Sequence, residues 1–423
     1  MSTEEKRNFQ ISQNSENSFS PDNELEVSKI VKKLYQENLP VEIIGSGSKR
    51  RIGKKLKCKK ILDLSKLSGV IEYLPEELYI KVKACTPIAE IEALLKKHNQ
   101  ELAFEPLDLG YMFYGKSNKG TASGHVSCNF SGSRRFKVGS IRDHVIGFRA
   151  VNGTGDIIKS GGNVVKNVTG YDLCKLICGS FGTLVALTEL TFKVLPSKEN
   201  SNTLVIHELS IKDATAMLNK VASSSSDTSG AVFLPLEPKN GNYEQNIESL
   251  FKLNDLQYKG PFTAIRLEGS KTSIQERLAN LKKELDLDSK EISNLDTYQS
   301  ILFWEKIKNL EFFNNSKNAV LRAVIPPSSC VKLINFLDNK YKYFVDWGGS
   351  LVWFEVNDLS NSSLQPIRQF ILELNGYLTV IKHPDDQRSL EEVFTVAPDR
   401  LDISNNIKKS FDPKKIFNPG KMY

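Results

Sequence analysis

The alternation of apolar and polar positions predicts a small α/β unit in the first hundred residues. One segment carries apolar side chains at helical spacing, and the runs after it are short and rich in β-branched residues, as in strands. Thr86 and Pro87 offer a capping hydroxyl and a first-turn proline, which favour the start of a further helix. The expected elements are a helix over 24–39, strands over 41–44, 61–64 and 79–83, and a helix from 87 to about 98.

The pattern changes at about residue 106, where long glycine-bearing loops alternate with strands. The tetrapeptide Asn152-Gly153-Thr154-Gly155 is a hairpin signal that joins two of these strands. The region therefore predicts a second, β-rich lobe, with strands over 145–151, 156–159 and 185–194.

A second change follows Pro196, where the polar break SKENSNT precedes strand-like and helix-like runs in turn. Such mixed runs predict an antiparallel sheet with helices on one face. The chain is therefore expected to divide into a disordered polar tail over 1–22, a first domain over 23–198 with subdomains at about 23–105 and 106–198, a second domain over 199–395, and a tail over 396–423.

The composition is typical of a protein with sizeable cores and no transmembrane helix. The 423 residues are 40% hydrophobic and 25% charged, with a net charge of +7 and no run of 18 apolar residues. The first 22 residues lack the apolar stretch of a secretory signal, so we expect a cytoplasmic protein. The six cysteines form no CxxC pair, which predicts reduced thiols and no metal site.

Glycine is concentrated in one stretch, because fourteen of the 26 glycines lie between Gly110 and Gly182. Glycine loses more backbone entropy on folding than other residues, so such a cluster indicates tight turns or a bulky ligand against the main chain. A separate loop, Gly45-Ser46-Gly47-Ser48, directly follows a predicted strand. We interpret the two regions as two polypeptide surfaces that hold one large phosphate-bearing cofactor.

The first loop matches neither of the two common phosphate-binding loops. A GxxxxGK[ST] loop needs four residues between its glycines, but five residues separate Gly47 from Gly53. A GxGxxG loop needs glycine where Arg50 stands, and no apolar helix opens after the loop to offer its N-terminus. What remains is a turn whose own N–H groups can point at an anion.

Small and hydroxyl residues mark the second region, namely Thr121, Ser123, Gly124 and, eight positions further on, Gly132. Basic residues follow, and they have two interpretations, as groups that neutralise a diphosphate or as surface charges. These residues are Arg134, Arg135, Lys137 and Arg142.

A lysine-rich run over 49–60 has two similar interpretations, since eight of its twelve residues are Lys or Arg. It is either a solvated loop or an electrostatic lip beside bound phosphates or a negatively charged partner. The run lacks interleaved aromatic residues, so we expect no nucleic-acid partner.

Five ordered motifs resemble the vanillyl-alcohol-oxidase/PCMH flavoproteins. The motifs are GSGSKRRIG, TASGHVSCNFSG, GSIRDHVIGFRAVNGTGDIIKSGGNVVKNVTGYDL, GSFGTLVALTELTFKVLP and FDPKKIFNPGKMY. Within that family, GGNVVKNVTGYDL is most similar to the FAD-binding E subunit of bacterial glycolate oxidase. The resemblance is strong over 24–198 and weaker beyond, apart from the tail that starts at Phe394.

The resemblance implies an α+β fold with a PCMH-type FAD-binding domain of two α/β subdomains over 23–198. It also implies an α+β, ferredoxin-like cap over 199–395, and a tail that returns to the FAD domain near the flavin. A simple C-terminal clasp is the alternative for 411–423. The cofactor-binding residues that it implies are Gly45, Ser46, Gly47 and Ser48 in a pyrophosphate loop, Thr121, Ser123, Gly124 and Gly132 in a second wall, Arg142 and Asp143 close by, Gly182 and Val185 on the adenine side, and Asn418 in the tail.

The cap departs from that of the family's catalytic members. Relatives that oxidise 2-hydroxy acids carry histidines there, but the comparable stretch DWGGSLVWFEVND has none. Such an oxidation needs a base for the hydroxyl proton and a cation for the carboxylate. We expect His125 and His383 to be structural. The first loop also lacks the histidine to which some relatives attach FAD, which favours noncovalent FAD.

These features predict the FAD-binding subunit of a glycolate oxidase complex, which takes part in 2-hydroxy acid oxidation and electron transfer. The resemblance implies a second, longer FAD subunit and an iron–sulfur subunit, with contact to the membrane only through partner subunits. One alternative is a stand-alone FAD-linked oxidoreductase acting on another hydroxyl substrate. A second is a noncatalytic scaffold in which FAD is structural or lost. The candidate bases for the first alternative are Tyr111, Tyr114, Tyr171 and Asp346.

Overall fold

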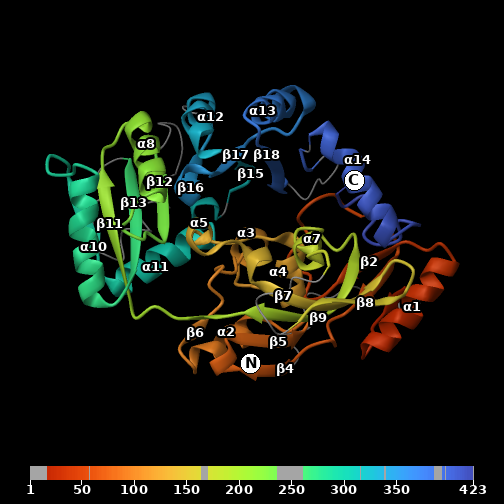
Figure 1. Ribbon diagram of the computed structural model, residues 1–423. Helices are drawn as coiled ribbons and strands as arrows, with labels where there is room; N and C mark the ends of the chain where they lie inside the picture. The colour runs from red at the N-terminus through yellow and green to blue at the C-terminus, as the bar shows by residue number, and fades with distance from the viewer. Residues whose placement is uncertain are drawn as a thin grey trace.

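The computed structural model describes residues 17–56, 58–162, 170–235, 261–314, 316–337, 340–384, 393–395 and 397–422. Sheets from the first half of the chain lie at the bottom of Figure 1, and an eight-stranded sheet from the second half lies above them. This mixed architecture confirms the predicted α+β class. Residues 1–16 of the tail expected over 1–22 lie outside the described residues.

A five-stranded antiparallel sheet forms the centre of the first part, with the order β4-β5-β9-β7-β8. The turn between β7 and β8 is the predicted hairpin, and the Asn152 side chain accepts hydrogen bonds from the backbone N–H of Thr154 and of Asp156 at 3.1 and 2.8 Å. The sheet joins strands from both sides of residue 105. Its strands are β4 (Val70–Leu74), β5 (Tyr79–Lys83), β7 (Val145–Asn152), β8 (Ile157–Gly161) and β9 (Val185–Lys193).

A smaller parallel sheet lies beside it, with the order β1-β3-β2. Helix α1 (Glu24–Gln36) begins at Asn23, whose side chain accepts from the N–H of Glu26, and its buried face packs on this sheet. Strand β1 belongs to the segment expected to be disordered, yet it pairs with β3. The strands are β1 (Ser18–Phe19), β2 (Val41–Ile44) and β3 (Lys60–Asp63).

Short helices pack against these sheets. Helices α2 and α4 contribute Ile88, Ile91, Ala122 and Val126 to the core of the five-stranded sheet. The elements of this region are α2 (Ile88–Lys96), α3 (Gly110–Tyr114), α4 (Ala122–Cys128), α5 (Arg135–Val138), α6 (Ile141–His144) and α7 (Leu173–Ile177), with the two-stranded pair β6 (Gln100–Glu101) and β10 (Leu195–Pro196).

The eight-stranded antiparallel sheet has the order β14-β11-β13-β12-β16-β17-β15-β18. Each half of it is a β-α-β-β-α-β unit, which is the ferredoxin-like motif, and the halves meet where β12 pairs with β16. The first half comprises β11 (Asn200–His207), α8 (Ile211–Ala222), β12 (Gly230–Leu234), β13 (Phe262–Gly269), α10 (Lys271–Glu284) and β14 (Ile292–Leu295). The second comprises β15 (Ala319–Val324), α12 (Cys330–Leu337), β16 (Tyr343–Asp346), β17 (Leu351–Val356), α13 (Asn361–Glu373) and β18 (Tyr377–Lys382).

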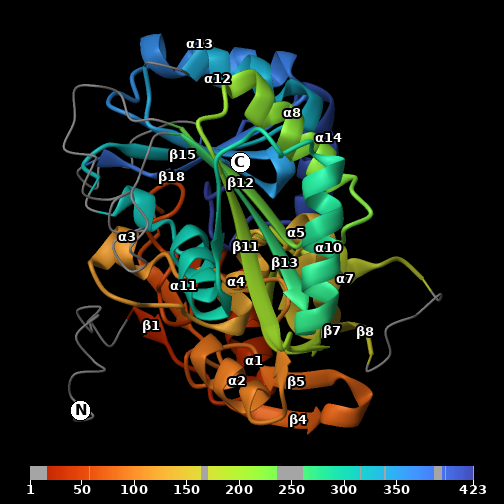
Figure 2. The ribbon, with the colours of Figure 1, turned by 90° about the vertical axis from the view of Figure 1, so that its left-hand side faces the viewer.

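The two faces of this sheet bury different partners. One face packs under α8, α10, α12 and α13, as Figure 2 shows for the helices above and beside the strands. The other face carries α11 (Thr297–Lys308) and forms one apolar cluster with Leu107, Met112 and Phe130 of the first part. The upper sheet therefore lies as a cap against the first part, with an apolar seam between them.

The C-terminal segment crosses back to the first part. After α14 (Pro398–Phe411) the chain runs beside β2, where Val41 and Phe417 form a parallel bridge. The N–H of Val41 donates to the carbonyl of Ile416 at 2.8 Å, and the N–H of Asn418 donates to the carbonyl of Val41 at 3.0 Å. The tail thereby adds a backbone contact to the edge of the parallel sheet.

Candidate functional site

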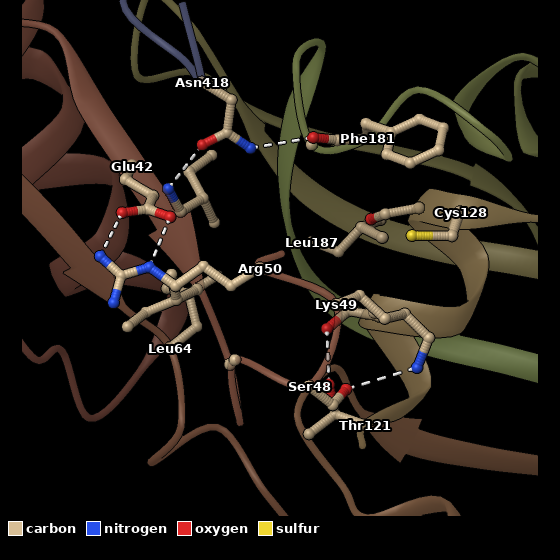
Figure 3. Close-up of a pocket in the computed structure, with 18 of the residues that line it drawn as sticks. Glu42, Ser48, Lys49, Arg50, Leu64, Thr121, Cys128, Phe181, Leu187 and Asn418 are labelled. Atoms are coloured by element: carbon tan, nitrogen blue, oxygen red, sulfur yellow. Dashed lines mark hydrogen bonds and ion pairs between the residues drawn. The ribbon is translucent and has the colours of Figure 1, made fainter. Parts of the chain in front are cut away.

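A pocket with about 760 Å³ of space free of protein atoms, part of it open to solvent, lies between the first loop, the second region and the tail. Figure 3 shows side chains from these three regions around it. Ten of the thirteen predicted site residues line it, namely Gly45, Ser46, Gly47, Ser48, Thr121, Ser123, Gly124, Gly182, Val185 and Asn418.

The first wall of the pocket is the loop that follows β2. Its turn is closed by a hydrogen bond from the N–H of Arg50 to the carbonyl of Gly47 at 3.1 Å. Gly47 has φ +72°, which favours glycine, and a Cβ there would meet no atom within 4 Å. The hydroxyl of Tyr114 also donates to the Gly47 carbonyl at 3.2 Å, which holds the turn in place.

The second wall is helix α4, where the sequence predicted only a glycine loop. The N–H of Ser123 donates to the carbonyl of Ala84 at 2.7 Å, which ties the helix to the end of β5. Gly124 lies inside this helix with an ordinary φ, and a Cβ there would lie 3.4 Å from Thr121 Oγ1, at ordinary contact distance. Neither the backbone nor the neighbouring residues therefore require glycine at this position.

The two walls touch each other through glycines. A Cβ on Gly45 would lie 3.0 Å from Cys85 Sγ and 3.1 Å from Thr121 Oγ1. A Cβ on Gly120, which has φ +79°, would collide with the hydroxyl of Ser48. The two walls therefore approach each other closely at Gly45 and Gly120, in contrast to Gly124.

The third side of the pocket is formed by the C-terminal tail, where Asn418 connects the tail to β2, the strand before the first wall. Its Oδ1 accepts from the N–H of Ile43 at 2.8 Å, and its Nδ2 donates to the carbonyl of Phe181 at 2.9 Å. A Cβ on Gly182 would lie 2.7 Å from that Nδ2, and φ +67° there also favours glycine. The amide of Asn418 is thus engaged with the main chain on both sides, as Figure 3 shows, and it fixes the shape of the pocket.

Three basic side chains line the pocket. Lys49 Nζ donates to the carbonyl of Lys119 at 3.0 Å, and burial lowers the Lys49 pKa to about 8. Arg50 is paired with Glu42, and Lys421 Nζ donates to the carbonyl of Arg50 at 3.2 Å. The start of the lysine-rich run therefore borders the pocket, in agreement with the interpretation as an electrostatic lip.

Three predicted residues lie outside this pocket. Asp143 is exposed and forms a capping box with Ser140, and its neighbour Arg142 is exposed as well. A Cβ on Gly132 would lie 2.6 Å from Glu105 Cβ, so this glycine is needed for packing at the seam with the cap. The structure thus gives each of them a position away from the loop and the helix, and their contact with a cofactor stays a prediction.

The basic residues after the second region differ in their contacts. Arg134 forms ion pairs with Glu101 and Glu268, and Lys137 forms one with Asp227. Both side chains are therefore already paired with carboxylates of the protein. Arg135 instead lies over the ring of Trp347, 4.0 Å from its centroid.

The histidine positions agree with structural roles. His125 is fully buried, and its Nε2 contacts the carbonyl of Lys119 at 2.6 Å. Burial, with a further contribution from Lys49, lowers the His125 pKa well below its usual value. His207 Nε2 lies 2.9 Å from the Ser293 hydroxyl. Within the described ranges no group of three or more His, Cys, Asp or Glu side chains is arranged to hold a metal ion.

Several pocket residues were not predicted. Ser127, Cys128 and Phe181 line it, and burial raises the Cys128 pKa to about 11, so the thiol stays neutral. Ser127 and Cys128 could have been predicted from their spacing, because they lie one helical turn after Ser123 and Gly124. Lys421 also lines it; the resemblance placed this residue in the tail that returns to the FAD domain, but did not assign it as a cofactor-binding residue.

Comparisons with known proteins agree with this arrangement. Residues 17–161 match the family model described as FAD binding domain. The chain is 28% identical over 393 residues to glycolate oxidase subunit GlcE of Escherichia coli, which covers 93% of this chain and 95% of that protein. It is 27% identical over 332 residues to glycolate oxidase subunit GlcD of Bacillus subtilis, with 72% and 68% covered.

A solved structure shows the same fold. Alkyldihydroxyacetonephosphate synthase aligns with a TM-score of 0.65 at 18% identity, over 95% of this chain and 75% of that one. No helix in the described part of the chain is long and apolar enough to cross a membrane. Together the matches confirm the predicted PCMH-type domain and the predicted FAD cofactor.

Proposed function

We propose that this chain, an FAD-dependent oxidoreductase with a PCMH-type FAD-binding domain, is the FAD-binding subunit of a glycolate oxidase complex. It holds FAD noncovalently between the loop after β2 and helix α4, and it passes electrons within the complex. The placement of FAD rests on Gly124 in α4, because neither its backbone conformation nor its neighbours require a glycine there.

Gly124 supports the fit of a ligand to the pocket. Glycine inside a helix is less stable than alanine by about 0.5–1 kcal/mol, and here no neighbouring atom excludes a side chain. The missing side chain leaves free space on the wall of the pocket. A flat or extended group that lies against the helix backbone would use this space.

The charges of the pocket fit an anionic ligand. Lys49 is a half-buried cation whose charged form is disfavoured by burial, and a diphosphate beside it would restore that form. Lys421 and Arg50 add positive charge at the same side, although Glu42 offsets part of it. We infer that these groups face the pyrophosphate of FAD.

The first loop reads Gly-Ser-Gly-Ser and offers no histidine for a covalent bond to FAD. Noncovalent binding therefore belongs to the proposal. When bound, FAD supplies the two-electron chemistry of the oxidation, and the protein supplies the binding, orientation and electrostatics. In this chain the backbone turn at Gly47, held by Tyr114, and the clamp made by Asn418 would fix the cofactor's position.

The subunit role is supported by the near-complete alignment with a GlcE subunit and by the lack of histidine in the cap stretch around Asp346. We infer a longer FAD subunit and an iron–sulfur subunit as partners, and a small 2-hydroxy acid as the substrate of the complex. A cytoplasmic chain that meets the membrane only through partner subunits belongs to the same proposal.

The isolated chain, loaded with FAD, is expected to show negligible glycolate-dependent dye reduction. Added partner subunits are expected to restore it, because the base for the hydroxyl proton would come from them. The measurement is dye reduction by the single chain and by the reconstituted complex, with a complex that lacks this chain as the control. Full activity of the chain alone would refute the subunit role.

Asp346 favours a second candidate, a stand-alone FAD-linked oxidoreductase. Burial raises the pKa of its carboxyl to about 7, and it accepts hydrogen bonds from Ser133 Oγ at 2.8 Å and from the N–H of Trp347 at 2.6 Å. A carboxyl that titrates near neutral pH at the seam between the cap and the FAD domain has the properties of a general base. Substrate-dependent bleaching of the flavin by the single chain would distinguish this candidate.

A further inference from the structure

Two arginines from different parts of the chain lie on one indole ring. The guanidinium carbon of Arg135, on α5 of the FAD domain, is 4.0 Å from the centroid of Trp347. That of Arg322, on β15 of the cap, is 5.0 Å from the same centroid. Figure 1 shows α5 directly beneath the strands of the cap. Two like charges therefore face each other across the seam between the two parts.

In the described part of the chain neither guanidinium group is hydrogen-bonded to an anion, although Asp143 is near enough to Arg135 to raise its pKa against a larger lowering by burial. Among the residues that the structure describes, no hydrogen bond or ion pair joins Arg135 or Arg322 to a carboxylate. The neighbouring arginines of the seam differ, since Arg134 and Arg266 both pair with Glu105 and Glu268. Glu105 and Glu268 are thus shared between Arg134 and Arg266, and neither carboxylate forms an ion pair with Arg135 or Arg322.

The surroundings of Arg322 make this lack of countercharge costly. Its guanidinium group lies among Phe130, Trp347 and Trp353, with ring centroids 5.5, 5.0 and 5.7 Å away. Aromatic faces attract a cation but accept few of its five N–H donors. Burial, with Arg135 as the second cause, lowers the Arg322 pKa to about 9. A bound anion would remove both penalties.

Arg135 and Arg322 are both half-buried, and the ring of Trp347 between them is buried. We propose that Arg135 and Arg322 form a binding site for a small monocarboxylate at the seam between the FAD domain and the cap. The two guanidinium groups would hold the carboxylate through charge-assisted hydrogen bonds, with Trp347 as the floor of the site. The choice of glycolate as ligand rests on the proposed function, whereas the site itself does not.

The proposed site gives the cap a role in binding the substrate. The sequence lacks the cap histidines of catalytic relatives, which indicated that this chain lacks its own base for the hydroxyl proton. With an arginine pair at the seam, the chain supplies the cationic group that a 2-hydroxy acid needs. The base would still come from Asp346 or from a partner subunit.

Calorimetric titration of the full-length protein with sodium glycolate tests the site without any need for turnover. The wild type is expected to bind glycolate saturably, at one molecule per chain. Arg322→Met and Arg135→Met are each expected to weaken binding by about tenfold or more, because one charge-assisted contact is lost. Arg322→Lys, which keeps the charge, is expected to bind more tightly than Arg322→Met.

Arg400→Met is the matched control, because Arg400 also lies over an aromatic ring, that of Tyr377, but elsewhere in the structure. Its affinity is expected to equal that of the wild type. Sodium sulfate and sodium chloride at equal ionic strength separate a carboxylate site from a general anion site. The proposal is overturned if the wild type shows no saturable heat, if both methionine variants bind as the wild type does, or if sulfate binds as tightly as glycolate.

Thermal unfolding gives an independent readout that folding failure cannot imitate. Arg322→Met removes a half-buried charge that has no ion-pair partner in the described residues, so its melting temperature without ligand is expected to equal or exceed that of the wild type. Glycolate is expected to raise the melting temperature of the wild type and to leave that of the variant unchanged. A variant that glycolate stabilises as much as the wild type would contradict the assignment. Because neither experiment follows flavin reduction, a failure here leaves the test of the subunit role intact.

Discussion

Gly124→Leu is expected to abolish FAD retention while the protein remains folded. The backbone at this position is helical, and leucine has a higher helix propensity than glycine by about 1 kcal/mol, so the ligand-free protein should lose no stability. The new side chain would occupy the free space that the helix leaves at the pocket. The measurement is the ratio of flavin to protein absorbance after purification, together with the melting temperature of the flavin-free protein.

Gly115→Leu is the matched control for this prediction. Gly115 has φ +66°, no atom within 4 Å of a Cβ, and a position outside the pocket. Leucine there is expected to reduce stability by about 1–2 kcal/mol because of the left-handed backbone, but to leave FAD binding unchanged. The two variants should therefore show opposite patterns. Normal flavin content in Gly124→Leu would show that the helix does not border the cofactor.

Lys408→Met is expected to destabilise the protein by about 3–5 kcal/mol, because it leaves a buried carboxylate without its partner. Lys408 Nζ donates to Asp412 Oδ2 at 2.6 Å and to the carbonyls of Thr183 and Phe417 at 2.5 and 3.1 Å. Asp412 is fully buried. Equilibrium unfolding in urea measures the change in the free energy of unfolding.

The same variant is expected to weaken FAD binding, because Asp412 positions the tail. Its carboxylate accepts from the N–H of Ile416 and of Phe417 at 3.0 and 2.8 Å, directly before Asn418. Lys409→Met is the control, since Lys409 is the exposed neighbour on the same helix. Equal stabilities of Lys408→Met and Lys409→Met would disprove the role of the buried pair in fixing the tail.

The long helices and strands could be predicted because their periodicity is local. Helix α1, strand β5 and the β7–β8 hairpin lie where the apolar pattern and the Asn-Gly signal placed them. Strand β4 was not predicted, since it is an edge strand with exposed Val70, Ile71 and Leu74 and lacks the alternation of a half-buried strand. Helix α14 was treated as tail because its polar sequence buries little more than Lys408.

The parts of the candidate site that lie within one continuous segment could be predicted from the sequence. The glycine and hydroxyl pattern identified both walls of the pocket, but it did not show that Gly124 lies in a helix, because glycine disfavours helices. Asn418 was predicted from the resemblance of the tail motif, but the partners of Asn418 and Lys421 lie more than 200 residues away, and no local pattern identifies them. Gly132 was assigned to the wall by the resemblance; its small size is needed for packing against Glu105, and its contact with the cofactor stays a prediction.

The most direct test of the central claim is a titration of flavin-free protein with FAD at pH 7 and pH 9. We predict saturation at one FAD per chain, with affinity at pH 9 lower by about tenfold. The reason is the Lys49 pKa of about 8 in the ligand-free protein, since above this pH the lysine must take up a proton when it meets the diphosphate. A protein that shows no saturable FAD binding at either pH would contradict the account.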